Sequence, residues 1–556
     1  MKTLNKLLVV FILITLIKTL SSYFVVSPSI FTDEYLYLKM GQSFFQSLTF
    51  NIHGLPSDTY LPIYPIITSL AFLLKQPTLI YLGIKIINSI LSTLIIIPAY
   101  LLAKEFLDEK KSFITAIIVG LLPMNVIIST YIMSENLFYT LFLTSIYFIY
   151  KSFTNKSYIY DILAGIFIGL SMLTRLSGTS LIMIVILTTL YRLYKKDYNE
   201  IKKKIIMGII TIMIILPWLI RNGLIFGFTK SGLLGNYSNA VQNSVLSYPN
   251  LFIWVIIYLG FIILSSCILL FALNFIALKE KLKREKTNIF TILSFITFGV
   301  IIIALSKYAA ASSIKQLTLI PGLNGRPIGR YIDTVLPLLT INGLITYYNY
   351  KDKIKTQLNK VLLVFIPIIL ISSQLMFFSL FPLNNLSVAE IGVVNFILEK
   401  FTSKLISVLI TTIIIIGIII GLIILNKKNI LRKYNIIKVL AIIFIVFNII
   451  NYSLVIYNSK TWYNHPQEQL SLWINENIHK DKLILIDKED CGIFTKETPK
   501  ILCTPKKATQ LTALWIINPV IIEDIKTPSD YIITSKKLDL ELIKKTENDI
   551  YLYKSK

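Results

Sequence analysis

Long apolar runs recur along most of this chain, and they limit its possible folds more than any other feature. A helix of about 20 apolar residues crosses a bilayer core of roughly 30 Å, and about thirteen runs of that kind are present. They lie near 6–26, 78–103, 112–130, 133–150, 158–174, 176–192, 204–220, 251–278, 288–306, 331–348, 360–379, 404–426 and 435–457. The fifth and sixth could form one helical hairpin that turns at 174–178. We therefore predict a mostly α-helical, polytopic transmembrane bundle with about 13 spans.

Composition and charge exclude the soluble alternatives. Hydrophobic residues make up 55% of the sequence and charged residues 15%, which lies outside the range of globular proteins. A net charge of +25 would suggest nucleic-acid binding in a soluble protein. Here the lysines occupy short gaps between apolar runs, as is typical of cytoplasmic loops, and no basic stripe with interleaved aromatics occurs. We therefore predict no nucleic-acid partner.

Lysine and arginine are concentrated in alternate loops, and this asymmetry predicts the orientation in the membrane. The basic loops are those that contain Lys110, Lys151, Lys195, Lys283, Lys353 and Lys427. The loops with less charge are 27–77, 221–250, 307–330, 380–403 and everything after about 458. We predict a multi-pass protein of the plasma membrane with a cytoplasmic N-terminus and an outer C-terminal segment. The first run follows Lys2 and Lys6 and lacks an A-x-A-like cleavage site, so we expect a retained signal anchor.

The chain changes character near residue 458. HPQEQLSLWINENI has the pattern of an amphipathic helix, and LILID, DYIITS and DIYLY are short β-rich runs between polar turns. We predict a transmembrane domain over 1–457 and a small extracytoplasmic α/β domain over 458–556. Cys491 and Cys503 lie in the second domain and could pair or remain free thiols. The run 61–74 is too short and proline-rich to span, so we expect it at the outer interface or as a re-entrant segment.

Few acids fall on the outer side of this topology, so each one is a candidate for chemistry. They are Asp33, Glu34, Asp58, Glu135, Asp333, Glu390 and Glu399. Asp33 and Glu34 follow the first span in SIFTDEYLYLKMGQSFF. They fit two interpretations: acids that cap a surface helix, or a carboxylate that takes a proton from an acceptor hydroxyl.

Basic residues also gather on the predicted outer side, although the positive-inside bias should drive them to the other face. They are Arg175, Arg221, Arg326 and Arg330, with Lys85 a short way inside the outer end of the second span and Lys18 in the outer half of the first. Each arginine alone fits an interfacial anchor, and each lysine and Glu135 fit side chains that snorkel to water. Lys85 could instead meet a phosphate. Their convergence with the acids on one face favours a substrate site.

Metal and nucleotide motifs are weak or missing. The histidines His53, His465 and His479 lack the spacing of metal ligands, so a histidine-based metal site is not predicted. Carboxylates with His53 could still hold a divalent cation. No P-loop, no GxGxxG that opens a helix and no GxSxG occurs in the sequence, so soluble nucleotide chemistry is not supported.

Five short motifs follow one another in a familiar order. They are DE in the first outer loop (Asp33, Glu34), SENLF (Ser134, Glu135), LTRLSG (Arg175), PWLIRNGLIFG (Pro217, Trp218, Arg221, Asn222, Gly227) and GRYIDTVLPLL (Arg330, Tyr331, Pro337). In this pattern the chain resembles the GT-C superfamily of glycosyltransferases, specifically its protein O-mannosyltransferase and aminoarabinose-transferase-like group. The acceptor-binding insertion of eukaryotic protein O-mannosyltransferases and the WWDYG motif of oligosaccharyltransferase catalytic subunits are absent, which leaves the acceptor open.

The resemblance implies a GT-C-like fold and an inverting transfer of a hexosyl or pentosyl unit. The donor would be a polyprenyl-phosphate-linked sugar, and the acceptor a hydroxyl of a protein, glycan or lipid-linked molecule at the outer face. Asp33 would act as the base, and Glu34 and Glu135 would orient the base or the sugar. The developing charge on the phosphate would be stabilised by positive side chains, and Tyr331 would join the substrate site. The candidates for that charge are Arg175, Arg221, Arg330 and Lys85.

Two other classes of protein stay open. A secondary transporter or lipid flippase usually places ionisable residues near the bilayer midplane, on broken helices in a repeated pattern. This sequence concentrates them at one rim and shows no repeat. A non-catalytic scaffold or receptor would tolerate alanine at the DE pair and at the outer arginines.

Overall fold

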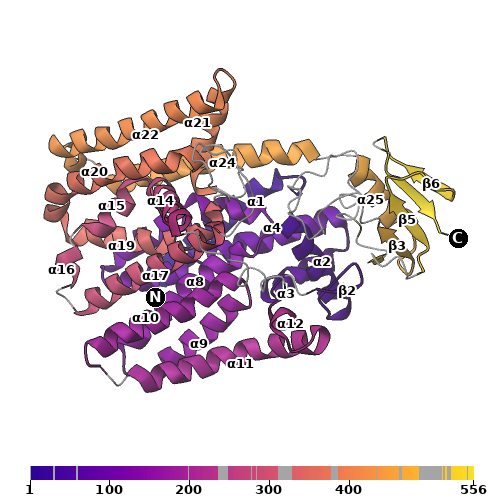
Figure 1. Ribbon diagram of the computed structural model, residues 1–556, viewed down its shortest axis with the longest axis horizontal. Coiled ribbons are helices and arrows are strands. Elements are labelled where there is room, and N and C mark those ends of the chain that lie inside the picture. Colours follow the sequence, from indigo (N-terminus) through magenta and orange to yellow (C-terminus); the bar gives the residue numbers. More distant parts are fainter. Residues whose placement is uncertain are drawn as a thin grey trace. The chain divides into compact units, whose positions relative to one another are not determined.

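The computed structural model of the chain describes most of its length (Figure 1). The described residues are 2–28, 32–57, 60–197, 200–235, 248–276, 278–282, 285–310, 328–376, 386–433, 435–462, 466–486, 516, 520–522, 528–547 and 549–555. The chain divides into two compact units, and each is described by itself. The first unit comprises Met1–Leu16, Leu91–Ile128 and Glu135–Leu454, and the second comprises Ile17–Ile90, Ser129–Ser134 and Val455–Lys556.

The first unit is helical. Its helices are α5 (Ile96–Lys104), α6 (Glu109–Gly120), α7 (Pro123–Ile127), α8 (Glu135–Thr154), α9 (Ile159–Met172), α10 (Ser180–Tyr194), α11 (Glu200–Phe226), α12 (Lys230–Leu234), α14 (Tyr248–Ser265), α15 (Leu269–Phe275), α16 (Leu278–Leu282), α17 (Glu285–Ala310), α18 (Gly329–Ile332), α19 (Leu336–Asn349), α20 (Lys351–Met376), α21 (Ala389–Glu399), α22 (Lys404–Lys427) and α23 (Ile430–Lys433). Within the described residues, the 3₁₀ turns among them are η3 (Leu176–Thr179), η4 (Asp333–Val335) and η6 (Leu386–Val388). In the described part of the chain, four elements have residues in both units: α1 (Lys2–Tyr23), α4 (Pro77–Thr93), α24 (Ile436–Trp462) and the turn η2 (Ile128–Thr130).

The second unit combines helices with a sheet. Its further elements are α2 (Thr32–Ser47), β1 (Asn51–Ile52), β2 (Leu55–Pro56), α3 (Ile63–Thr68), η1 (Ser69–Leu74), α25 (Pro466–Asn477), β3 (Leu483–Ile486), β4 (Val520–Ile522), β5 (Tyr531–Thr534), β6 (Glu541–Lys545) and β7 (Tyr551–Lys554). The last five strands form one sheet in the order β4-β3-β5-β7-β6. Strand β3 pairs in parallel with β4 and β5, and the β5-β7-β6 ladder is antiparallel. The helix and the three strands predicted in this segment are α25, β3, β5 and β7.

Apolar helices of spanning length identify a multi-pass membrane protein. Among the described residues, eight helices are long and apolar enough to cross a membrane, or up to 10 if each of two bent helix pairs is one span. The predicted runs 133–150, 158–174 and 331–348 form α8, α9 and α19, which are not among them. Helices α9 and α19 have only 14 residues each, and α8 and α19 are buried over most of their length. The count of about 13 therefore stays a prediction.

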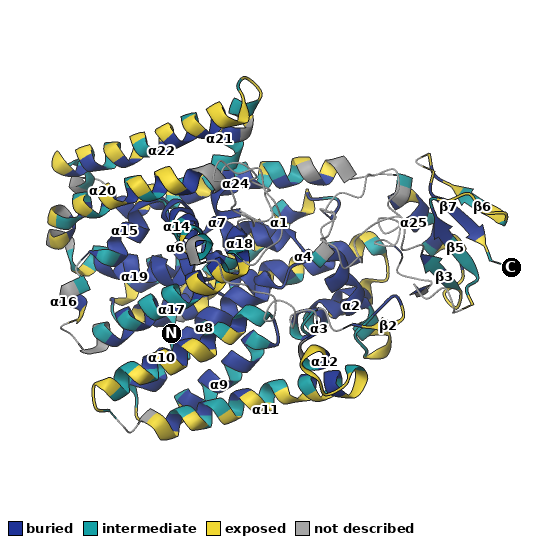
Figure 2. Ribbon diagram, in the orientation of Figure 1, coloured by how far each residue is buried: buried dark blue, intermediate teal, exposed yellow. Residues whose placement is uncertain are grey.

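The lipid-facing character of a helix can be read from its exposed side chains. Figure 2 shows exposed residues along α11 and α22, where Ile209, Ile212, Ile413 and Ile418 are all more than half exposed. Water does not favour such a surface, whereas the hydrocarbon of a bilayer does. The exposed isoleucines are therefore consistent with membrane-spanning helices.

The chain turns at 174–178, where the sequence predicts a turn between two apolar runs. Helix α9 ends at Met172, and the chain turns through Arg175 and the 3₁₀ turn η3 into α10. A Cβ atom at Gly178 would lie 2.7 Å from backbone atoms of Ser171 and Met172. Only glycine therefore fits without a shift of the backbone, and this tight turn fixes the position of Arg175.

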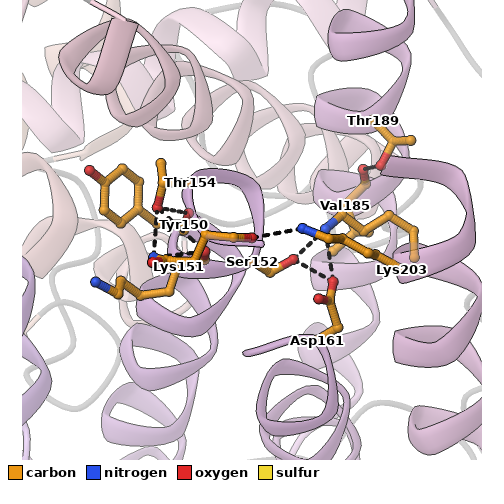
Figure 3. Close-up of polar contacts among 10 residues, drawn as sticks. Tyr150, Lys151, Ser152, Thr154, Asp161, Val185, Thr189 and Lys203 are labelled. Carbon is orange, nitrogen blue, oxygen red and sulfur yellow. Dashed lines mark hydrogen bonds and ion pairs between the residues drawn. The ribbon is translucent and has the colours of Figure 1, made fainter. Parts of the chain in front are cut away.

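A buried ion pair joins α8, α9 and α11 (Figure 3). Lys204 Nζ lies 2.9 Å from Asp161 Oδ1, and the Ser152 hydroxyl donates to the same oxygen at 2.7 Å. The side chain of Asp161 is fully buried and that of Lys204 is 8% exposed. Next to it, Lys203 Nζ donates to the carbonyl of Asn155 at 2.7 Å. The loop lysines at the start of α11 thus attach this helix to its neighbours.

Candidate active site

Asp33 lies in the first turn of α2, where acids stabilise the helix through its dipole. Its side chain is half-buried. The hydroxyl of Tyr60 donates a hydrogen bond to Asp33 Oδ1, and the Tyr60 ring contacts that of Tyr37 with centroids 4.6 Å apart. The carboxylate is thus oriented by a partly buried aromatic donor. Tyr60 was missed in the sequence because a single tyrosine among loop aromatics carries no pattern.

Glu34, next to Asp33, is buried and has a different environment. It is 0% exposed, and its Oε1 accepts a hydrogen bond from the backbone N–H of Ile132 at 2.9 Å. Such a contact across distant segments holds α2 in place. Glu34 therefore has a positioning role in the structure, whereas Asp33 retains partial access to solvent.

Lys85 also makes structural contacts. It is 2% exposed and donates to the carbonyls of Ser22, at 2.8 Å, and Val25. Its ammonium lies 4.2 Å from the centroid of the Tyr81 ring. Two of its three N–H donors are thus used by the backbone at the end of α1. These contacts favour a role in packing over one at a phosphate.

The first unit holds a second cluster, built on Glu135 at the start of α8. Glu135 is 1% exposed. Its Oε2 lies 2.6 Å from Arg175 Nη1, and its Oε1 lies 3.6 Å from Arg330 Nε. Each guanidinium has five N–H donors and a carboxylate accepts about four hydrogen bonds, so Glu135 cannot engage all of them. The arrangement holds two arginines side by side at one buried carboxylate.

Tyr331 completes this cluster, which we call the Glu135 cluster: Glu135, Arg175, Arg330 and Tyr331. The Cζ atoms of Arg175 and Arg330 lie 5.1 and 5.4 Å from the centroid of the Tyr331 ring. Tyr139 Oη donates to the carbonyl of Arg330 at 2.7 Å, which fixes the backbone there. The structure thus brings together three separate segments of the sequence, at 135, 175 and 330. Tyr139 was missed because it lies inside an apolar helix.

The remaining candidates lie elsewhere or outside the described residues. The contacts described for Arg221 are within α11: Nη1 donates to Asn222 Oδ1 at 2.8 Å, and Cζ lies 4.7 Å from the Trp218 ring. Asp333 is fully buried and close enough to Glu135 for an electrostatic interaction. Five further residues singled out in the sequence lie outside the residues that the structure describes: Asp58, Arg326, His465, Cys491 and Cys503.

The sequence leaves open a divalent-cation site formed by His53 and carboxylates. In the part of the chain that the structure describes, no group of three or more His, Cys, Asp or Glu side chains could hold a metal ion. His53 Nε2 contacts the hydroxyl of Tyr35 instead. A divalent cation therefore remains a prediction from sequence alone.

Part of the chain matches a known protein family, and nearly the whole chain is similar in fold to a solved structure. Residues 62–220 match the family model of dolichyl-phosphate-mannose-protein mannosyltransferases, and this range contains Lys85, Glu135 and Arg175. The chain is similar to the crystal structure of ArnT from Cupriavidus metallidurans bound to undecaprenyl phosphate, with a TM-score of 0.59, 11% identity, and coverage of 98% of this chain and 97% of that one. For ArnT of the same organism in the apo state the TM-score is 0.58, with 11% identity and coverage of 99% and 98%.

At this low identity the likeness to ArnT establishes the fold and leaves the chemistry to the residues of this chain. No curated protein sequence matches the chain. The family match contains the motifs SENLF and LTRLSG, and the likeness in fold covers nearly the whole chain.

Proposed function

We propose that this chain is a GT-C superfamily protein of the aminoarabinose- and O-mannosyltransferase-like group, and that it is a membrane glycosyltransferase with a polyprenyl-phosphate-linked donor. It transfers a hexosyl or pentosyl unit to an acceptor hydroxyl at the outer face of the plasma membrane. The similar ArnT structure is bound to undecaprenyl phosphate, which supports a donor of this class. The long tail of such a lipid requires a protein within the bilayer.

The observation that carries the proposal is the pair of arginines at Glu135. A polyprenyl phosphate is a weakly basic leaving group, so its departure needs positive charge more than a strong acid. Guanidinium groups bind phosphate through two parallel N–H···O bonds, and a buried setting strengthens these bonds. Arg175 and Arg330, held by Glu135 and Tyr331, would receive the developing negative charge.

Asp33 is assigned as the base. In the step proposed, the acceptor oxygen bonds to the anomeric carbon, the bond from that carbon to the phosphate oxygen breaks, and the acceptor proton passes to the Asp33 carboxylate. Attack from the side opposite the phosphate inverts the anomeric carbon. The Tyr60 hydroxyl orients the carboxylate for this task, and Glu34 holds the helix that carries it.

The test is transfer of a radiolabelled sugar from a short-chain polyprenyl-phosphate donor by the purified full-length protein, with a membrane extract as the source of acceptors. We expect Asp33→Asn to lower the rate about 10²–10⁴-fold, the usual contribution of a general base. Asp108→Asn, which changes an exposed acid at the start of α6, serves as the matched control and should transfer like the parent.

Undiminished transfer by Asp33→Asn would remove the assignment of the base. If the parent binds the donor lipid but transfers no sugar, and a gradient in sealed vesicles depends on the protein, the transporter alternative takes the place of the transferase. Binding of the donor is measured separately so that these outcomes can be told apart.

A further inference from the structure

A cavity of about 230 Å³, lined by polar residues and one glycine, opens between the C-terminal half of α2 and the β1–β2 hairpin, wholly within the second unit. Its floor is formed by Lys39, Gln42 and His53, which are 5%, 8% and 6% exposed. Gln46 and Ser47 lie at its exposed mouth. Burial thus increases from mouth to floor, which is the shape of a pocket and not of a flat polar surface.

The floor is held in place by specific contacts. Lys39 Nζ donates to Gln42 Oε1 at 3.1 Å and to the carbonyl of Ile516 at 2.6 Å. His53 contacts the hydroxyl of Tyr35. These bonds fix the amine of Lys39 in the floor of the cavity. A ligand in the cavity would therefore meet a preformed floor.

The hairpin wall is equally constrained. His53 and Gly54 form its two-residue turn with φ of 51° and 78°, which is the backbone of a type I′ turn and favours glycine at the second position. The backbone N–H of Asn51, in β1, donates to Ser43 Oγ of α2 at 2.9 Å. The hairpin is thus fastened to α2 along the pocket.

The charge of the lining indicates a neutral ligand. Among the described residues that line the cavity, none is acidic and Lys39 is the single amine. Burial lowers the pKa of Lys39 to about 7, so near neutral pH much of it is uncharged. A dianionic phosphate would find little compensation for its charge here. Amide and hydroxyl side chains instead match the paired donors and acceptors of sugar hydroxyls.

Distance along α2 separates this cavity from the proposed base. Lys39 and Gln42 follow Asp33 by six and nine residues on the same helix, which corresponds to about 9–14 Å at 1.5 Å per residue. A sugar in the cavity is therefore too far from Asp33 to carry the hydroxyl that reacts. A ligand that reaches both places must have more than one sugar unit.

We propose that this pocket binds one neutral sugar unit of an extended glycan acceptor, at a distance from the unit that receives the transferred sugar. The inference rests on the proposed function and specifies its acceptor as a carbohydrate. Its small volume, below the range of about 300–1,000 Å³ for drug-sized ligands, suits a single ring.

The experiment is ligand-observed NMR of the purified full-length protein with methyl α-mannoside, methyl β-glucoside and N-acetylglucosamine as neutral probes and inorganic phosphate as the anionic one. Gln46→Trp fills the mouth of the pocket, and Lys39→Met removes the amine from its floor. Gln76→Trp, at an exposed glutamine of the same unit that does not line the pocket, is the matched control. Melting temperatures show whether each variant is folded.

We expect at least one sugar to bind the parent and the Gln76→Trp control within about twofold of each other, and to bind Gln46→Trp and Lys39→Met about tenfold more weakly. The inference is overturned if no sugar binds the parent, if both pocket variants bind as tightly as the parent, or if phosphate displaces the sugar. Binding of a short-chain polyprenyl phosphate is measured in the same samples. If the lipid binds and the sugars do not, the pocket assignment fails while the proposed transferase stands.

Discussion

The proposed donor site depends on Arg175 and Arg330. The contribution of their planar guanidinium groups can be separated from that of their positive charge. A change of either residue to lysine keeps the positive charge but removes the planar fork and its stacking on Tyr331. We expect Arg175→Lys and Arg330→Lys each to weaken binding of a short-chain polyprenyl phosphate about tenfold, which corresponds to about 1.4 kcal/mol. Isothermal calorimetry in detergent measures this affinity.

The matched control is Arg192→Lys, at the end of α10, where the arginine pairs with Asp197. The affinity of this control for the lipid should stay within about twofold of the parent. A weakened Arg192–Asp197 pair lies outside the Glu135 cluster and leaves the charge of that cluster unchanged. Equal losses in the control and in the two site variants would mean that general basicity, and not the Glu135 cluster, holds the lipid.

The sequence predicted the members of this cluster better than their partners. Glu135, Arg175 and Arg330 are rare charges at the rims of apolar runs, and such charges need each other when buried. No comparable signal marks Tyr60 or Tyr139, because tyrosines are common at membrane interfaces. Lys85 carried the same signal as the arginines, but its partners are backbone carbonyls, which no sequence pattern reveals.

At the scale of elements, the Asp161–Lys204 ion pair ties α9 to α11 and, through Ser152, to α8. Asp161→Asn would leave the buried Lys204 charge without its counter-ion. We expect this change to lower the free energy of unfolding by about 3–5 kcal/mol, as found when one partner of a buried pair is removed. Thermal unfolding in detergent follows the loss, and Asp108→Asn, at an exposed pair, should show little change.

The double variant Asp161→Leu with Lys204→Met tests the reason for that loss. If the cost comes from an uncompensated buried charge, apolar replacement of both partners should restore most of the stability. A double variant as unstable as Asp161→Asn would show instead that the hydrogen bonds around Ser152 hold the three helices together.

Helices and strands were predictable where a regular pattern of apolar residues dominates a segment of the sequence. Apolar runs predicted the long helices, and a short polar break between two runs predicted the turn at Gly178. Strands β4 and β6 were missed: β4 has three residues, and ELIKK in β6 is mostly exposed and charged. The predicted run 251–278 hid the bend of 114° between α14 and α15, because the break, which begins at Ser265 and Ser266, contains neither glycine nor proline.

At the scale of the whole molecule, the prediction of about 13 spans can be tested through the parity of membrane crossings. The loop near Ser157 and the C-terminal sheet are predicted on opposite sides, which requires an odd number of crossings between them. In a background with Cys267, Cys491 and Cys503 changed to serine, a membrane-impermeant maleimide should label Lys537→Cys in intact cells. It should label Ser157→Cys only after the cells are opened; both positions are exposed.

The basic loops give the physical reason for this expectation, since lysine and arginine in short loops are retained on the cytoplasmic side. Labelling of both positions from the same side would mean an even number of crossings, and one predicted span would then be a buried or re-entrant helix. Helices α9 and α19, with 14 residues each, are the first candidates for that role. Labelling of Ser157→Cys alone in intact cells would reverse the orientation and place Asp33, behind the first span, on the cytoplasmic side, where the proposed outer-face transfer could not occur.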